Sequence, residues 1–231
     1  LAIMMAELVS IPIYTSLTSK AIYQVLTHSE SKAIIIGKLD DYFSIKDGIP
    51  SIPKIGIELY GIQEEYSWEN IIQSETSEIT IKFPKLSDIH TIIYTSGTTG
   101  EPKGVMLDHN NFAASLKAHQ EILNVDENDV SLSFLPLSHI YERSWVFFCI
   151  QSGVQVYFNQ NPKEIAEVLK EVKPTLMCTV PRIFEKIFTA IQDKRKEASP
   201  IKMKLASWAL GIGNAYNNKY KRIAKKVPIM L

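Results

Sequence analysis

The sequence predicts an α/β fold built on a largely parallel sheet with helices on its faces. Short apolar runs rich in β-branched residues recur along the chain, at residues 33–36, 91–95 and 154–158. Segments with helical patterns lie between them, and this alternation is typical of β-α-β units. The chain has 231 residues, 45% of them hydrophobic, which is enough to bury a core.

Local signals give the order of the predicted elements. In the first half we expect strands at residues 9–14, 33–36 and 54–59, helices at 19–27 and 67–73, and a polar connector at 74–87. In the second half we expect strands at 91–95, 154–158 and 176–180, with helices at 110–123, 161–173, 182–194 and from Ser199 onward. Asp108 and the Asn161-Pro162 pair mark helix starts, and Pro174 marks a helix end.

Composition and charge narrow the classes of function. The chain has 25 Lys+Arg and 25 Asp+Glu, so no global positive field attracts nucleic acid, and we expect no nucleic-acid partner. The longest apolar run, residues 145–150, is far shorter than the ~18 residues of a membrane-spanning helix.

Cys149 and Cys178 lack metal-binding spacing, which predicts buried, reduced thiols in a cytoplasmic protein. The basic stretches 194–196 and 219–226 favour solvated helix faces, with peripheral contact to anionic lipid as the alternative.

The strongest chemical signal is the Gly-rich segment YTSGTTGEPKG at residues 94–104. Its glycines let the backbone approach an anion, its hydroxyls donate hydrogen bonds to phosphoryl oxygens, and Lys103 adds a point charge. A Walker A loop is disfavoured, because that pattern needs Gly before the lysine and Ser or Thr after it, whereas Pro102 and Gly104 stand here. The alternative is a hydroxyl-rich loop between strand and helix without a ligand. The order of these residues after a buried strand favours a phosphate cradle.

Three segments resemble a known family. YTSGTTGEPKGV, at residues 94–105, resembles the phosphate-loop signature of the AMP-forming, adenylate-forming ligases, which include acyl-CoA synthetases. LPLSHIYER, at residues 135–143, and VPRIFEK, at residues 180–186, most resemble the long-chain fatty acid–CoA ligases. The resemblance covers essentially the whole chain and implies that residues 1–231 are a partial N-terminal, AMP-binding domain of the adenylate-forming ligase fold.

The resemblance also implies a two-step reaction. A fatty acid carboxylate attacks the α-phosphorus of ATP, pyrophosphate leaves, and the acyl-adenylate is then transferred to coenzyme A. The implied cofactors are ATP, Mg²⁺ and coenzyme A as a co-substrate, and the implied partners are these small molecules and the fatty acid. The residues implied to hold the β- and γ-phosphates are Thr95, Ser96, Gly97, Thr98, Thr99, Gly100 and Lys103, with Lys103 also catalytic through its charge.

Further candidate residues lie downstream of the loop. By resemblance His139 lies near the acyl carboxylate and orients it electrostatically, whereas a lone histidine among apolar residues is otherwise a packing residue. The i, i+3 spacing of His139 and Glu142 suits a helical metal site, but no second pair occurs, so no metal ligand is assigned in this chain. Trp145 either lines an acyl tunnel or packs in the core, and Arg182 either faces substrate or anchors structure. Arg143 stands where some bacterial relatives carry a gating tryptophan.

The later motifs of the family are absent from the sequence. No GYGxTE block, TGD or PxxGK follows Lys186, and the chain begins at Leu1 without a basic leader. We therefore interpret the chain as a fragment that lacks the rest of its domain and the C-terminal lid domain, and we expect the fragment alone to be inactive. Two alternatives remain open: a non-catalytic homologue that binds a nucleotide or an acyl chain, and an adenylating enzyme for another carboxylic acid.

Overall fold

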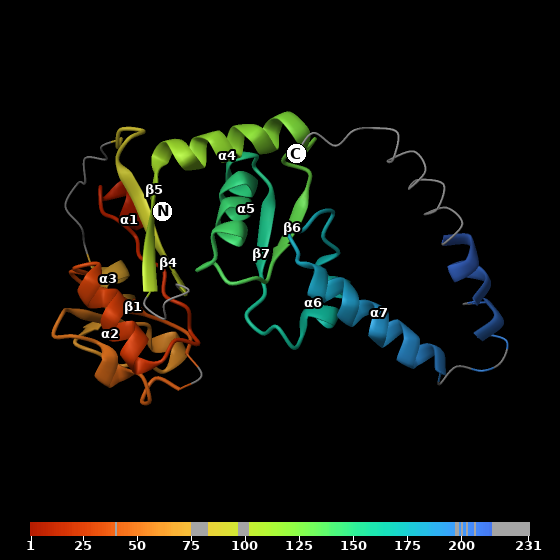
Figure 1. The fold of residues 1–231 in the computed structure, drawn as a ribbon, viewed down its shortest axis with the longest axis horizontal. Helices are drawn as coiled ribbons and strands as arrows, with labels where there is room; N and C mark the ends of the chain where they lie inside the picture. Colours follow the sequence, from red (N-terminus) through yellow and green to blue (C-terminus); the bar gives the residue numbers. More distant parts are fainter. Residues whose placement is uncertain are drawn as a thin grey trace. The chain divides into compact units, whose positions relative to one another are not determined.

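The computed structural model describes residues 1–39, 41–74, 83–96, 102–196, 199, 201, 203–205 and 207–213. The chain divides into two compact units, Leu1–Cys178 and Thr179–Leu231. The first unit contains the helices α1 to α6 together with the strands β1 to β7, and the second contains α7 (Figure 1). All the paired strands among the described residues therefore belong to the first unit.

The N-terminal part of the first unit is a small parallel sheet with a helix packed against it. Its strands are β1 (Ile34–Ile36), β2 (Lys54–Gly56) and β3 (Tyr66–Ser67), paired in parallel in that order. Its helices are α1 (Ala2–Met5), α2 (Ser19–His28) and α3 (Trp68–Gln73), with 3₁₀ turns at Lys46–Gly48 and Glu58–Tyr60. Helix α2 begins after Thr18, whose Oγ1 accepts a hydrogen bond from the amide of Ala21. The buried core of this part comprises Ile22, Leu26, Ile36, Tyr42, Ile49 and Ile62.

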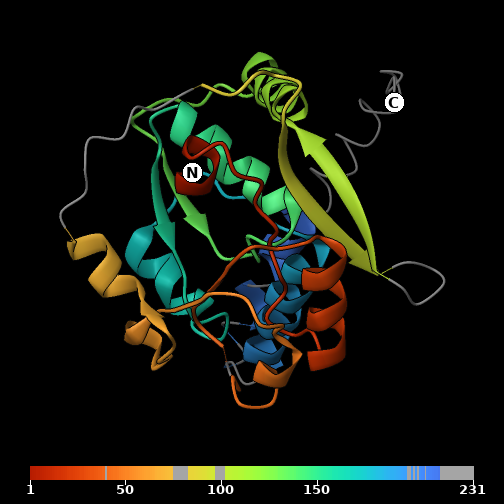
Figure 2. The same cartoon turned by 90° about the vertical axis from the view of Figure 1, so that its left-hand side faces the viewer.

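The two ends of the Gly-rich segment, residues 94–96 and 102–104, lie in a pair of long antiparallel strands (Figure 2). β4 (Ile89–Ser96) pairs with β5 (Pro102–Asp108), and the register runs from Ile89 opposite Asp108 to Ser96 opposite Pro102. The sequence analysis predicted β4 but placed no strand between the Gly-rich segment and the following helix. That helix is present as α4 (His109–Ile122), and a capping box between Asp108 and Asn111 starts it as predicted.

A β-α-β unit forms the C-terminal part of the first unit. β6 (Val130–Ser133), α5 (Ile140–Gln151) and β7 (Gln155–Phe158) follow one another, and the two strands pair in parallel. Helix α6 (Ile165–Val172) comes next and ends at Lys173, which adopts a left-handed conformation with φ of 49° just before Pro174. The two parallel sheets with flanking helices confirm the predicted α/β class.

Two of the predicted strands are reduced to isolated bridges, and the strand predicted at residues 54–59 extends only over Lys54–Gly56. Residues 9–14 and 176–180 contribute single parallel bridges, Ser10 to Thr91 and Leu176 to Ser131. Pro12 lies within the first of these segments and has no amide hydrogen to donate to a ladder, which limits the pairing. Both bridges are nevertheless parallel, one to β4 and the other to β6, and parallel pairing is what the sequence analysis expected.

The second unit begins with α7 (Pro181–Lys196), with Pro181 at the predicted helix start. The described residues between 201 and 213 are also helical, in agreement with the prediction of a further helix. Among the residues that the structure describes, no helix has both the length and the apolar character needed to cross a bilayer.

Candidate functional site

The open end of the β4–β5 pair places Thr95 directly opposite Lys103. Residues that are directly opposite in antiparallel strands project from the same face. Both side chains are exposed, so a hydroxyl and an ammonium group lie side by side at the start of the Gly-rich loop. The predicted phosphate ligands Gly97, Thr98, Thr99 and Gly100 lie outside the described residues, as does the side chain of Ser96.

Tyr94 packs on the other face of this hairpin. Its partner across the strands is Gly104, where an added Cβ would lie 3.2 Å from Cζ of Tyr94 and 2.9 Å from Cγ2 of Ile92. The Tyr94 hydroxyl lies 2.7 Å from Nδ1 of His28, at the end of α2, and burial raises the pKa of the phenol. The close packing of the tyrosine ring gives Gly104 a structural role, separate from any approach to an anion.

His139 lies at the N-terminus of α5. Its Nδ1 accepts a hydrogen bond of 3.2 Å from the amide of Tyr141, which satisfies one of the free amides at the start of the helix. In the neutral ring the proton is therefore on Nε2. The side chain is exposed, so His139 caps the helix with one nitrogen and keeps the other available as a donor.

Glu142 points into the protein interior. Its side chain is 0% exposed, and its Oε1 accepts a hydrogen bond of 2.6 Å from Oγ of Ser133. Burial raises the pKa of this carboxyl group. His139 and Glu142 therefore do not share a site, since one side chain is exposed and the other is enclosed. Among the described residues, no three His, Cys, Asp or Glu side chains are placed to hold a metal ion.

Trp145 makes packing contacts inside the first unit. Its Nε1 donates a hydrogen bond of 3.1 Å to Oγ of Ser131, and its ring centroid lies 5.7 Å from that of Phe148 and 6.4 Å from that of His119. Phe148 is 1% exposed and belongs to the core. These contacts agree with the core-packing alternative, and an acyl-lining role for Trp145 stays a prediction.

His90 is a buried histidine at the irregular position of β4. It is 5% exposed, and neither ring nitrogen has a hydrogen-bond partner within the described structure. The ring centroids of His109, Phe112 and Phe147 lie 4.9, 4.4 and 5.7 Å from its own. Burial, together with the nearby His109 and Arg143, lowers the pKa of His90 to about 4. The imidazole is therefore neutral at pH 7 and packs among these aromatic rings.

Arg143 is a residue whose role the sequence analysis did not find. Its Nη1 donates hydrogen bonds of 2.9 Å to Oγ1 of Thr91 and 3.4 Å to Oγ of Ser10. The guanidinium is half-buried, and burial lowers its pKa. Instead of a gating tryptophan, this position of α5 carries a cation that is bound to β4. The only signal in the sequence was a basic residue in the aromatic-rich segment 140–150.

Cys149 and Cys178 are buried, free thiols, as predicted, whereas the cytoplasmic location inferred from them stays a prediction. Burial raises the pKa of each thiol to about 11. Because the thiolate is the nucleophilic form, neither residue is suited to attack a substrate at neutral pH.

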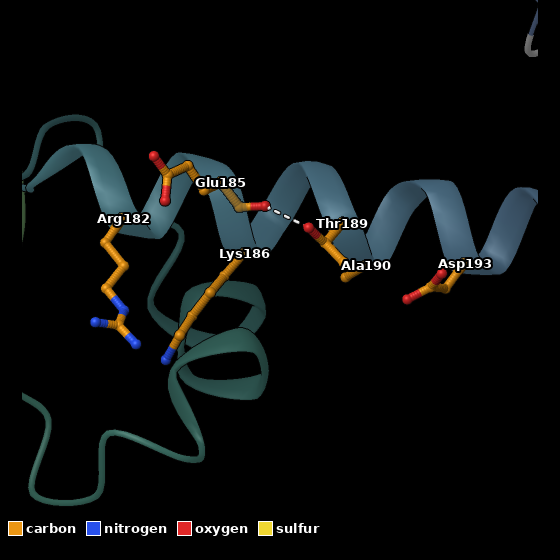
Figure 3. Close-up of a pocket in the computed structure, with 6 residues that line it drawn as sticks. All are labelled: Arg182, Glu185, Lys186, Thr189, Ala190 and Asp193. Atoms are coloured by element: carbon orange, nitrogen blue, oxygen red, sulfur yellow. Dashed lines mark hydrogen bonds between the residues drawn. The ribbon is translucent and has the colours of Figure 1, made fainter.

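Arg182 belongs to the second unit. It is exposed in the first turn of α7 and points to the same side of that helix as Lys186 (Figure 3). Both residues line a shallow pocket, whose other lining residues are Glu185, Thr189, Ala190 and Asp193. Because one helix supplies the whole lining, this pocket is a polar surface hollow rather than an enclosed space for an acyl chain.

The architecture is that of the adenylate-forming ligases. O-succinylbenzoate CoA synthetase (MenE) from Bacillus subtilis, in complex with the acyl-adenylate intermediate OSB-AMP, superposes with a TM-score of 0.66 at 22% identity, over 81% of this chain and 47% of that chain. A putative long-chain-fatty-acid CoA ligase from Rhodopseudomonas palustris gives a TM-score of 0.66 at 21% identity, over 81% of this chain and 48% of that chain. The chain belongs to the family of AMP-binding enzymes, whose sequence profile matches residues 1–228.

Curated relatives of the chain are long-chain acyl-CoA synthetases. Long chain acyl-CoA synthetase 4 of Arabidopsis thaliana is 29% identical over 95% of this chain and 36% of its own length. The peroxisomal long chain acyl-CoA synthetase 7 of the same plant is 32% identical over 93% of this chain and 32% of its own length. The chain thus spans about a third of the length of these relatives.

Proposed function

We propose that residues 1–231 are part of the N-terminal, AMP-binding domain of a long-chain fatty acid–CoA ligase. The full-length protein activates a fatty acid with ATP and Mg²⁺ to the acyl-adenylate and then transfers the acyl group to coenzyme A. The family and the names of the curated relatives support this proposal. The observation that carries it is the position of Thr95 opposite Lys103 at the open end of the β4–β5 hairpin.

In this proposal the hairpin supplies two kinds of contact to the triphosphate. Lys103 places a positive charge beside the phosphoryl oxygens, and the hydroxyl of Thr95 donates a hydrogen bond to them. Each charge-assisted hydrogen bond contributes about 1.5–3 kcal/mol. The remaining contacts come from Ser96, Gly97, Thr98, Thr99 and Gly100, which lie between these two side chains in the sequence.

His139 acts in the proposal by orienting the acid. Nδ1 is engaged by the amide of Tyr141, so Nε2–H is the donor available to a carboxylate or α-phosphate oxygen. This arrangement suits charge stabilisation at a fixed position, and it needs no proton transfer. The described residues offer no set of ligands for Mg²⁺, so we derive no step through the metal.

The proposal also includes the location of the enzyme in the cell, two further substrate contacts and the partners. We place the enzyme in the cytoplasm, with its basic stretches 194–196 and 219–226 available for peripheral contact with anionic lipid. Trp145 and Arg182 are the further substrate contacts of the proposal. Its partners are small molecules, and it includes no nucleic acid.

ATP–pyrophosphate exchange in the full-length protein tests the proposal. Fatty acids of graded chain length are compared with amino acids and aryl acids as the carboxylate. We expect exchange with long-chain fatty acids and a loss of at least about 100-fold on Lys103→Ala, because a charge that stabilises the leaving pyrophosphate is removed. Lys117→Ala, which removes an exposed lysine from α4, is the matched control and should retain full exchange.

The outcomes separate the proposal from its alternatives. Exchange supported only by amino or aryl acids identifies an adenylating enzyme for another carboxylic acid. Nucleotide binding without exchange by any acid identifies a non-catalytic homologue. Equal exchange by the Lys103→Ala and Lys117→Ala proteins contradicts the role of the hairpin.

A further inference from the structure

Arg143 joins helix α5 to strand β4. Its Nη1 donates to Oγ1 of Thr91 at 2.9 Å and to Oγ of Ser10 at 3.4 Å. Thr91 is 0% exposed, and its own hydroxyl donates to the carbonyl oxygen of Ser10 at 2.6 Å. The guanidinium therefore contacts two adjacent chain segments that are bridged to each other. Such a contact to a buried hydroxyl is stronger and more directional than a surface hydrogen bond.

Glu142, the residue before Arg143, connects the same turn of α5 to a different strand, β6. Glu142 is fully buried, and its Oε1 accepts from Oγ of Ser133, the last residue of β6, at 2.6 Å. Adjacent helical residues point about 100° apart, so Glu142 and Arg143 reach β6 and β4 on different sides of α5. The first turn of the helix is thus fixed from two directions.

The two elements that Arg143 joins carry the two parts of the candidate site. His139 caps α5 one helical turn before Arg143, about 6 Å along the axis. Thr91 lies four residues before Thr95, about 13 Å along β4, and both side chains project from the same face of the strand. Arg143 is therefore a direct link between α5, which His139 caps, and β4, which carries Thr95.

We propose that Arg143 is a positioning residue, which holds His139 at a fixed distance from Thr95 and Lys103 by anchoring α5 to Thr91 of β4. The inference rests on the proposed function of the site. Arg143 itself contacts no substrate in this account, and its whole effect on the reaction passes through His139. A displacement of about 1 Å of a group that orients a substrate can lower a rate by about 100-fold.

The test measures kcat for adenylate formation in the full-length protein at a temperature where every variant is folded. Arg143→Met keeps the length of the side chain and removes its donors, and Thr91→Val keeps the shape of the acceptor and removes its hydroxyl. We expect each change to lower kcat by about 10- to 100-fold with little change in the KM for ATP. In a His139→Ala background the same two changes should lower kcat no further, because the residue that they position is gone.

Ser115→Ala is the matched control. Oγ of Ser115 lies 2.9 Å from Oγ of Ser144 and anchors the same helix to α4 instead of β4. It should leave kcat within about twofold of the wild type. Amide hydrogen exchange at residues 140–143, which requires no substrate, should be faster in Arg143→Met and Thr91→Val than in the control.

Three results overturn this inference. The first is an additive loss when Arg143→Met is combined with His139→Ala, which would show an effect independent of His139. The second is an equal loss of kcat in Ser115→Ala, and the third is unchanged turnover of His139→Ala. A wild-type protein that shows no exchange with fatty acids refutes the proposed function instead, and the exchange rates of the amides then still report whether Arg143 anchors the helix.

Discussion

Replacement of Gly104 by alanine tests how the β4–β5 hairpin is packed. The added Cβ would lie 2.9 Å from Cγ2 of Ile92 and 3.2 and 3.4 Å from two ring atoms of Tyr94. A contact below 3 Å forces a movement, and Cγ2 of a β-branched side chain cannot rotate away as the end of a lysine can. The alanine must therefore push the Tyr94 ring or separate the two strands.

The cost can be worked out from these contacts. Overpacking of a well-packed site costs about 1–3 kcal/mol. If the ring moves far enough to lose the 2.7 Å hydrogen bond between Tyr94 and His28, about 1 kcal/mol is added. A total of about 2–4 kcal/mol corresponds to a fall in Tm of about 4–16 °C for a domain of this size.

This loss of stability is measured by thermal unfolding of the full-length protein. The quantity compared is the Tm of the transition of the domain that contains residues 1–178. The same substitution in an Ile92→Ala background should cost less than half as much, because the closest contact is gone. A Gly104→Ala protein whose Tm equals that of the wild type would refute the reasoning. So would an equal cost in both backgrounds, because the strain would then lie elsewhere.

Two further predictions concern stability. Asp108→Ala removes the cap that accepts from the amide of Asn111 at 2.7 Å, and it should destabilise the protein by about 0.5–2 kcal/mol in denaturant unfolding, while Lys117→Ala at an exposed position of the same helix is the control. For His90 the folded pKa of about 4 lies below the unfolded value of 6.5, so the unfolded state binds the proton first as the pH falls. The contribution of His90 to the free energy of unfolding is constant above pH 6.5. Between pH 6.5 and 4 it should fall by up to about 1.4 kcal/mol per pH unit. His90→Phe should lack this dependence between pH 7 and 5, and an identical slope in both proteins would contradict the assignment.

The elements that the sequence predicted well have strong local signals. β4 has a run of apolar, β-branched residues, and α4 has Asp108 and Asn111 at capping-box spacing. β5 was missed because it begins with Pro102 and contains Gly104, two residue types that are depleted in strands. Only the pairing with β4 makes this segment a strand.

Helix α5 and strand β6 were missed for a different reason, which is burial on more than one side. The buried residues of α5 include Glu142, so the helix shows no clean division into apolar and polar faces, and it is capped by His139 instead of the usual Ser, Thr, Asp or Asn. In β6 the alternating serines suggest a polar outer face, yet Ser131 and Ser133 are both buried. Ser131 receives a hydrogen bond from Trp145, and Ser133 donates one to Glu142. Such partners come from tertiary structure and have no signature in local sequence.

The identities of Thr95 and Lys103 were predictable from the Gly-rich segment, but their position opposite each other depends on β5. β5 also changes the electrostatics expected at the loop. In a loop that leads directly into a helix, the helix N-terminus contributes partial positive charge to a bound phosphate. Here α4 begins only after the seven residues of β5, about 20 Å from the loop end of the hairpin, and the effect of a helix terminus falls off within one turn. The N-terminus of α4 therefore adds little positive charge to a bound triphosphate, which makes the charge of Lys103 more important and agrees with the large loss expected on Lys103→Ala.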